Sequence, residues 1–145
     1  MLCPPKSRVP SAEPPSAELI FTMTEPQPSP RELIDTFAKG WSKADLDKIL
    51  SVFSDNAVFI ETPFAPPHTG RDAIRRYWAD VPYNQSEITV TTGELHTAGP
   101  WFSTEFKVVF RRRRTGEWVE ARGALFCESE GDKVTEMRMY WHRNG

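Results

Sequence analysis

The chain has 145 residues and a formal net charge of −2, with 39% hydrophobic and 26% charged residues. This length is sufficient for one hydrophobic core of ordinary size, and the near-neutral charge excludes a broad electrostatic attraction to nucleic acid or to an acidic membrane surface. Cys3 and Cys127 are too few for a disulfide framework and lack metal-ligand spacing, so they indicate a reducing compartment, with the cytoplasm as the default location.

The N-terminal segment, residues 1–28, is dominated by proline, serine and glutamate, and this composition predicts a disordered tail. Its apolar patch, Leu19 to Phe21, is too short to span a membrane or to form the hydrophobic part of a signal peptide. Met23 is followed by Thr-Glu-Pro, which is typical of a protein start. The sequence therefore leaves open whether the natural protein starts at Met1 or at Met23.

Three amphipathic helices are predicted after this tail. The segment Ser29-Pro30-Arg31-Glu32 is typical of a helix start, with a capping box and a proline at the first helical position. Ser42 and Asp45 repeat the cap signature before a short helix, and Gly70 precedes the third helix. The inward faces of the three helices contain Leu33, Ile34, Phe37 and Trp41, then Leu46, Ile49, Leu50 and Phe53, then Ile74, Tyr77, Trp78 and Val81.

A short apolar strand, Ala57 to Ile60, lies between the second and third helices and is followed by a carboxylate, Glu61. Period-2 alternation places Glu61 on the same face as Phe59. If this face looks into a closed interior, a partly desolvated Glu61 is suited to act as a general base or acid. The alternative is that Glu61 reaches water or pairs with an arginine and has a structural role.

The last part of the chain predicts a sheet, because β-branched and aromatic residues are concentrated in segments separated by turn signals. The predicted strands are Ile88–Leu95, Trp101–Phe110, Trp118–Glu128 and Val134–Trp141. Helices followed by strands indicate an α+β domain, here residues 29–145, in which a curved antiparallel sheet wraps as a cone around the helices. Such a cone leaves an apolar pocket for a small ligand between sheet and helices.

The run Ser54-Asp-Asn-Ala57, the strand, the proline-rich loop and Gly70-Arg-Asp-Ala-Ile74 together resemble the SnoaL-like branch of the NTF2-like superfamily. This superfamily includes ketosteroid isomerases and polyketide cyclases. The resemblance extends from about Ser29 to Arg143, because Glu-x-Arg-Gly followed by Gly-x-Lys-Val resembles the closing hairpin of the family. It implies an NTF2-like cone with a mixed or antiparallel sheet and, as is frequent in the superfamily, a homodimer. It does not specify a reaction.

The alignment with ketosteroid isomerases that this resemblance implies places Glu61 on their general base. The positions of their two enolate-stabilising donors fall on Phe37 and Ala124, and neither side chain can donate a hydrogen bond. Steroid isomerisation is therefore not expected, because such donors supply a large part of the catalytic stabilisation. The charged set of the epoxide hydrolases is also replaced by apolar residues, at Phe106, Val108 and Met139.

Two patterns conflict over Glu120 and Arg122, which share one face of a predicted strand. The alignment turns this face toward the pocket. The opposite face is the more apolar one, and it consists of Val119, Ala121, Gly123, Leu125 and Cys127. The two residues therefore either line the pocket or form an ion pair that orients the strands from outside.

The expected site combines one catalytic carboxylate, Glu61, with a largely aromatic pocket. The expected pocket residues are Phe37, Phe59, His68, Tyr77, Trp78, Phe106, Glu120, Arg122, Met139 and Trp141. His68 either covers the pocket mouth from its loop or is solvated. Neither a metal nor a cofactor is expected, since the sequence contains no metal-ligand spacing, phosphate-binding loop or nucleophile elbow.

A basic cluster, Arg111 to Arg114, is predicted on a hairpin turn, where nearby glutamates offset it, so neither nucleic-acid binding nor membrane binding is expected. Two functions remain. The first is a cofactor-independent isomerase, cyclase or lyase in which Glu61 moves a proton on an apolar carbonyl or polyketide-like substrate. The second is a noncatalytic ligand-binding or dimerisation module.

Overall fold

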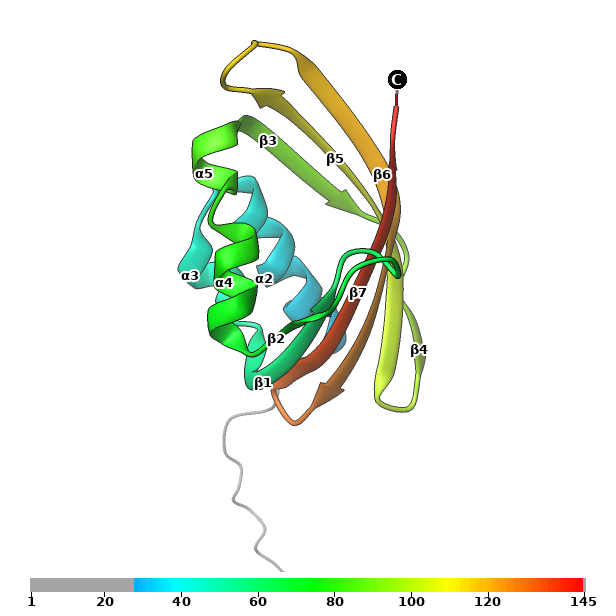
Figure 1. Cartoon of the computed structure of the whole chain (residues 1–145). Helices are drawn as coiled ribbons and strands as arrows, with labels where there is room; N and C mark the ends of the chain where they lie inside the picture. Colours follow the sequence, from blue (N-terminus) through cyan, green and yellow to red (C-terminus); the bar gives the residue numbers. More distant parts are fainter. Residues whose placement is uncertain (1–27, 145) are drawn as a thin grey trace, which may run out of the picture.

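The computed structural model describes residues 28–144, so the predictions for the N-terminal tail, including Cys3 and the two possible starts, lie outside the described residues. Four helices and seven strands follow one another along this part of the chain (Figure 1). The helices are α2 (Pro30–Ser42), α3 (Leu46–Leu50), α4 (Arg71–Trp78) and α5 (Val81–Asn84). The strands are β1 (Phe53–Ile60), β2 (His68–Thr69), β3 (Gln85–Thr92), β4 (His96–Ala98), β5 (Trp101–Arg112), β6 (Trp118–Glu130) and β7 (Lys133–Arg143).

The helix starts follow local capping chemistry. The Glu32 backbone N–H donates to Ser29 Oγ at 3.1 Å and the Ser29 backbone N–H donates to Glu32 Oε1 at 2.7 Å, which confirms the capping box of α2. Asp45, and not Ser42, caps α3. The Ser42 hydroxyl instead accepts a hydrogen bond from the Val90 backbone N–H at 3.1 Å.

Two predicted element boundaries are wrong for physical reasons. The third helix is divided into α4 and α5, with Pro82 in the first turn of α5, where a missing N–H is tolerated. Phe53 belongs to β1 and not to the second helix, because it is paired with Val134 of β7.

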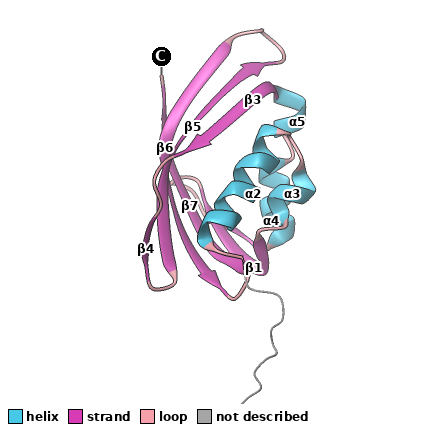
Figure 2. Ribbon diagram, turned by 180° about the vertical axis from the view of Figure 1, so that it is seen from behind, coloured by secondary structure: helices cyan, strands magenta, loops and turns pink. Residues whose placement is uncertain are grey.

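The sheet has the order β2-β1-β7-β6-β5-β3, with β4 paired to β5. The described pairs are antiparallel except for β1 and β7, which run parallel. All four helices cover one face of the curved sheet (Figure 2). This arrangement confirms the α+β class and the NTF2-like cone with a mixed sheet. The parallel pairing places the end of β1, where Glu61 follows, beside Arg138 of β7.

Burial along β6 decides which of its faces looks toward the helices. Val119, Ala121, Leu125 and Cys127 are buried, and most of them pack in the core with residues of the helices. The intervening side chains therefore lie on the outer face. The expectation that Glu120 and Arg122 line the interior pocket is wrong, because a strand cannot turn both the apolar set and this pair inward. They form an ion pair on the outer face, with 2.7 Å between Arg122 Nε and Glu120 Oε2.

Backbone atoms of β7 lie close to Gly123 of β6. A Cβ built on it would overlap the carbonyl oxygen of Tyr140 and would lie 2.7 Å from the Cα of Trp141. Backbone of the neighbouring strand thus fills the place of a side chain, and a residue without a Cβ is required here. This close approach fixes the position of Trp141 at the open end of the cone.

Candidate functional site

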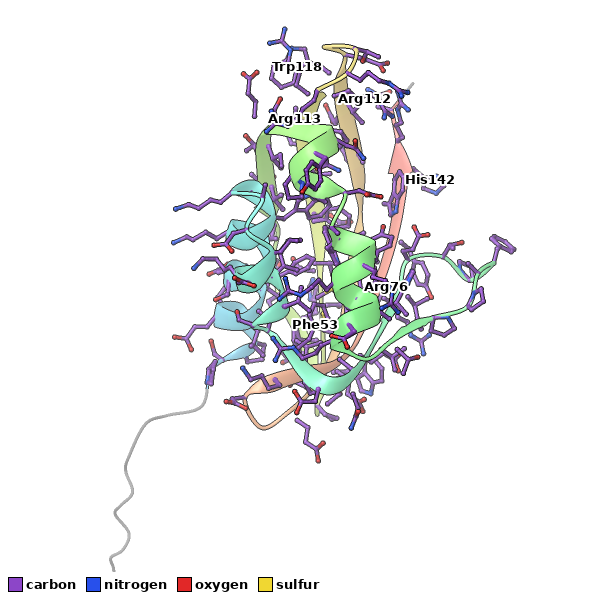
Figure 3. All side chains as sticks on the ribbon, turned by 60° about the vertical axis from the view of Figure 1, so that its left-hand side comes forward. Phe53, Arg76, Arg112, Arg113, Trp118 and His142 are labelled. Carbon is purple, nitrogen blue, oxygen red and sulfur yellow. The ribbon has the colours of Figure 1, made fainter. Side chains whose placement is uncertain are left out.

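An interior cavity of about 330 Å³ lies between the helices and the inner face of β5, β6 and β7. Its walls are mainly apolar, and they include the large side chains of Trp41, Tyr77, Trp78, Phe106, Phe110, Met139 and Trp141. The polar residues in its lining include Asp80, Asn84 and Arg143, and these three are exposed to solvent. Trp141 is 42% exposed, so the cavity opens to solvent on this side. Figure 3 shows Arg112, another lining residue, near the same end of the molecule as Arg113 and Trp118.

Five of the expected pocket residues line this cavity, namely Tyr77, Trp78, Phe106, Met139 and Trp141. Phe37 and Phe59 are instead fully buried behind it and pack against the Trp78 ring at centroid distances of 5.4 and 5.7 Å. These two residues support the cavity wall and do not form it.

Glu61 accepts a hydrogen bond from Tyr77, a residue of the cavity wall. The Tyr77 hydroxyl donates to Glu61 Oε2 at 3.4 Å across 16 positions of sequence, and the Tyr77 ring packs against the rings of Phe59 and His68 at 4.9 Å each. Burial, together with the negative charge of Glu61 and this hydrogen bond, raises the pKa of the Tyr77 phenol well above its ordinary value. Tyr77 therefore stays protonated near neutral pH and acts as the donor in this pair.

Glu61 itself lines a second hollow, an open groove of about 1050 Å³. Its walls include the loop after β1 and outer-face residues of the sheet such as Lys107, Arg122 and Tyr140. In the view of Figure 1 the loop after β1 crosses β7, which lies between β1 and β6 in the sheet. His68 is not among the residues that line either hollow. The acid thus lies between the groove, which it lines, and the interior cavity, which it reaches through the Tyr77 hydroxyl.

Further residues line the cavity besides those in the expected set. Val119 and Ala121 line the cavity from β6, and the signal that could have found them is the apolar alternation of that strand. Gln85 also lines it, and its Oε1 accepts a hydrogen bond from Trp41 Nε1 at 3.1 Å. The pairing of Tyr77 with Glu61 has no spacing signal, because it joins a helix to a loop.

Three of the four arginines in the basic cluster form ion pairs or hydrogen bonds within the molecule. Arg111 pairs with Glu87 at 3.3 Å, Arg112 pairs with Glu117 at 3.3 Å, and the Arg113 side chain donates to the carbonyl oxygen of Pro82. Within residues 28–144, no group of three or more His, Cys, Asp or Glu side chains could hold a metal ion, and no helix is long and apolar enough to cross a membrane.

A curved mixed sheet that encloses helices and an aromatic cavity defines an NTF2-like domain. The chain belongs to the SnoaL-like domain family, because residues 34–137 match the model of that family. No curated protein matches the sequence.

Solved structures share this fold at low sequence identity. A hypothetical protein with a ketosteroid isomerase-like fold from Catenulispora acidiphila, in complex with trimethylamine, has a TM-score of 0.69 and 16% identity over 77% of this chain and 86% of its own. The epoxide hydrolase/cyclase-like enzyme SalBIII, which has a role in pyran ring formation in salinomycin, has a TM-score of 0.68 and 19% identity over 77% and 89%. A ketosteroid isomerase-like protein from Erwinia carotovora atroseptica has a TM-score of 0.61 and 12% identity over 77% and 92%. These similarities concern the fold.

Proposed function

We propose that the domain of residues 29–145 is a cofactor-independent isomerase, cyclase or lyase that acts on a small, largely apolar carbonyl or polyketide-like molecule. The substrate binds in the interior cavity, and Glu61 is the general base. The observation that carries this proposal is the position of Tyr77. This residue lines the cavity, and its hydroxyl donates a hydrogen bond to Glu61. This contact connects a carboxylate with an apolar chamber of the size that small ligands occupy.

The proton moves in one concerted step. The Tyr77 oxygen accepts a proton from the carbon next to the substrate carbonyl while the Tyr77 hydroxyl proton passes to Glu61. The substrate becomes an enolate, Glu61 becomes neutral and Tyr77 remains a phenol. A free phenolate is not formed, in keeping with the raised pKa of Tyr77. Return of the proton from Glu61 to another carbon completes an isomerisation. Attack of the enolate on a second carbonyl forms an alkoxide, and return of the proton from Glu61 to this alkoxide completes a cyclisation.

The experiment measures exchange of the protons beside the carbonyl of cyclohexanone and camphor for deuterium in D₂O, followed by NMR. Glu61→Gln is expected to slow the protein-catalysed exchange by about 10²-fold or more, because the general base is lost. Glu120→Gln is the matched control, since it removes a carboxylate of the outer face and should leave the rate unchanged. Equal rates for the wild type and Glu61→Gln would refute the role of Glu61.

The second candidate is a noncatalytic ligand-binding or dimerisation module. The observation that favours it is that Glu61 lines the outer groove and not the interior cavity. A module should bind the same ketones without accelerating exchange, and Glu61→Gln should retain the affinity of the wild type. The exchange assay and a binding titration together separate the two functions.

We also propose a homodimer that pairs the outer faces of two sheets. Trp101, Trp118 and Phe126 are 37, 52 and 41% exposed, respectively, on that side of the molecule, next to charged residues of both signs. Such a mixture of aromatic and opposite charges suits a self-complementary interface. Sedimentation analysis should show a dimer that Phe126→Glu converts to a monomer, and a monomeric wild type at high concentration would contradict this part of the proposal.

A cytoplasmic location fits the thiol of Cys127, which is buried and free within the described residues. Fractionation of cells that produce the protein from its natural gene would test the location.

A further inference from the structure

One polar atom of a residue that lines the cavity has no hydrogen-bond partner. Trp78 is 1% exposed, its side chain lines the interior cavity, and its indole Nε1 is buried without a hydrogen-bond acceptor. Among the side chains of residues 28–144 it is the single buried polar atom in this state. The other deep tryptophan of the cavity, Trp41, donates to Gln85 and is satisfied. A buried donor without an acceptor is costly, so its retention needs a reason.

Packing prevents Trp78 from turning its donor toward solvent. Its ring makes edge-to-face contacts with Phe37 at 5.4 Å, Trp41 at 5.0 Å and Tyr77 at 5.4 Å, and it also contacts Phe59. A phenylalanine at this position would supply an aromatic surface without an N–H group. The indole N–H is therefore a fixed donor in an otherwise apolar part of the molecule.

The charged residues of the lining restrict what this donor can meet. Arg112 and Arg143 both pair with Glu117, at 3.3 and 3.1 Å, and Asp80 is exposed to solvent. The aromatic rings around Trp78 carry no charge, and an ionised ligand group would be desolvated among them without a counter-charge. The acceptor that fits is thus a neutral oxygen on an apolar body.

We propose that Trp78 Nε1 donates a hydrogen bond to the carbonyl oxygen of the ligand in the interior cavity. The same contact discriminates ketones from hydrocarbons of equal shape. This inference rests on the proposed function only in assuming that the cavity binds a ligand, and not on proton transfer by Glu61. In the proposed reaction it also supplies a donor to the enolate oxygen, at a residue other than Phe37 and Ala124.

The experiment follows the tryptophan Nε1–H signals of the ¹⁵N-labelled protein during titration with cyclohexanone or camphor. Matched titrations use the analogues in which an exocyclic methylene group replaces the carbonyl oxygen. The Trp78 signal, assigned by its loss in Trp78→Phe, is expected to shift downfield with the ketones and to move much less with the methylene analogues. Since this measurement is made on the wild type, it does not depend on the folding of a variant.

Affinity provides the second measurement. Trp78→Phe is expected to weaken binding of the ketones by about 3- to 10-fold more than binding of the methylene analogues, the range expected for one neutral hydrogen bond. Trp41→Phe is the matched control, because its donor is already paired with Gln85, and it should affect ketone and analogue alike.

Three outcomes would overturn the inference. In the first, the Trp78 signal moves equally with ketone and analogue, which indicates that the N–H group points at the face of a neighbouring ring. In the second, Trp78→Phe weakens both ligand types to the same extent. In the third, neither type binds. Ketone binding with the Trp78 shift but without Glu61-dependent exchange supports this inference while refuting the catalytic proposal, so the two failures are distinguishable.

Discussion

Replacing Gly123 by alanine tests the close approach of β6 and β7 that shapes the open end of the cavity. The added Cβ would lie 2.7 Å from the Cα and 2.8 Å from the Cβ of Trp141, and would overlap the carbonyl oxygen of Tyr140. To reach an ordinary carbon–carbon separation of about 3.5 Å from the Trp141 Cα, the strands must move apart by about 0.8 Å, and the overlap with the Tyr140 carbonyl oxygen requires a larger movement. Backbone atoms form most of the obstacle, so a change of side-chain rotamer does not relieve it.

The cost has two parts. Overpacking costs about 1–3 kcal/mol, and weakening about two ladder hydrogen bonds costs about 0.5–1.5 kcal/mol each, which gives about 2–6 kcal/mol in total. This is a large part of the roughly 5–15 kcal/mol by which a domain is stable. Because Trp141 lies directly opposite Gly123, the cavity is also expected to lose affinity for its ligand.

The assay is urea unfolding followed by far-UV circular dichroism. Gly93→Ala is the matched control, because a Cβ there meets its nearest atom, the Glu105 carbonyl oxygen, at an ordinary 3.7 Å. We expect this control to change the free energy of unfolding by less than about 0.5 kcal/mol. If Gly123→Ala is as stable as the control, the proposed contact between the strands does not exist in solution.

Three further predictions concern the helix start, a buried thiol and the proton path. Ser29→Ala should lower the free energy of unfolding by about 0.5–2 kcal/mol in the same assay, because the capping box of α2 is lost, and no change would show that the cap is not formed. Burial raises the pKa of Cys127 from 9.0 to about 12. Between these values the unfolded state has lost the proton that the folded state keeps, so stability should fall by about 1.4 kcal/mol per pH unit above about pH 9. The pH series should show a smaller fall for Cys127→Ala, and an unchanged slope would refute the assignment. Tyr77→Phe should slow ketone exchange by about 10²-fold, like Glu61→Gln, while NMR titration shows retained binding; unchanged exchange would exclude Tyr77 from the proton path.

Local signals predicted the elements well where the chemistry is local. The capping box at Ser29 and Glu32 involves atoms a few residues apart, and it forms as predicted. The same local spacing predicts that Ser42 caps the second helix. In the structure its hydroxyl instead accepts a hydrogen bond from the backbone N–H of Val90, 48 positions away. A distant partner of this kind leaves no mark on the spacing of neighbouring residues.

The choice of the inward face of β6 shows a second limit of prediction from the sequence. Alternation alone predicts that Val119, Ala121, Leu125 and Cys127 face inward, and these residues are buried in the structure. The family alignment predicts that Glu120 and Arg122 face inward, and the structure places them on the outer face. Burial of apolar surface dominates the choice of face, because turning the charged pair inward would desolvate it and would expose the apolar set.

The sequence by itself determined the α+β class and the aromatic composition of the cavity, since these follow from hydrophobic periodicity and turn chemistry. Its motifs also carried the family resemblance, which implied the cone. Only the tertiary structure decided that Glu61 meets Tyr77, that Glu61 lines a groove beside the cavity it was expected to enter, and that the Trp78 donor is left without a partner. Such contacts depend on how the helices pack onto a sheet whose first strand pairs with its last. Packing of this kind is set by shape and distance in three dimensions, which periodicity along the chain does not encode.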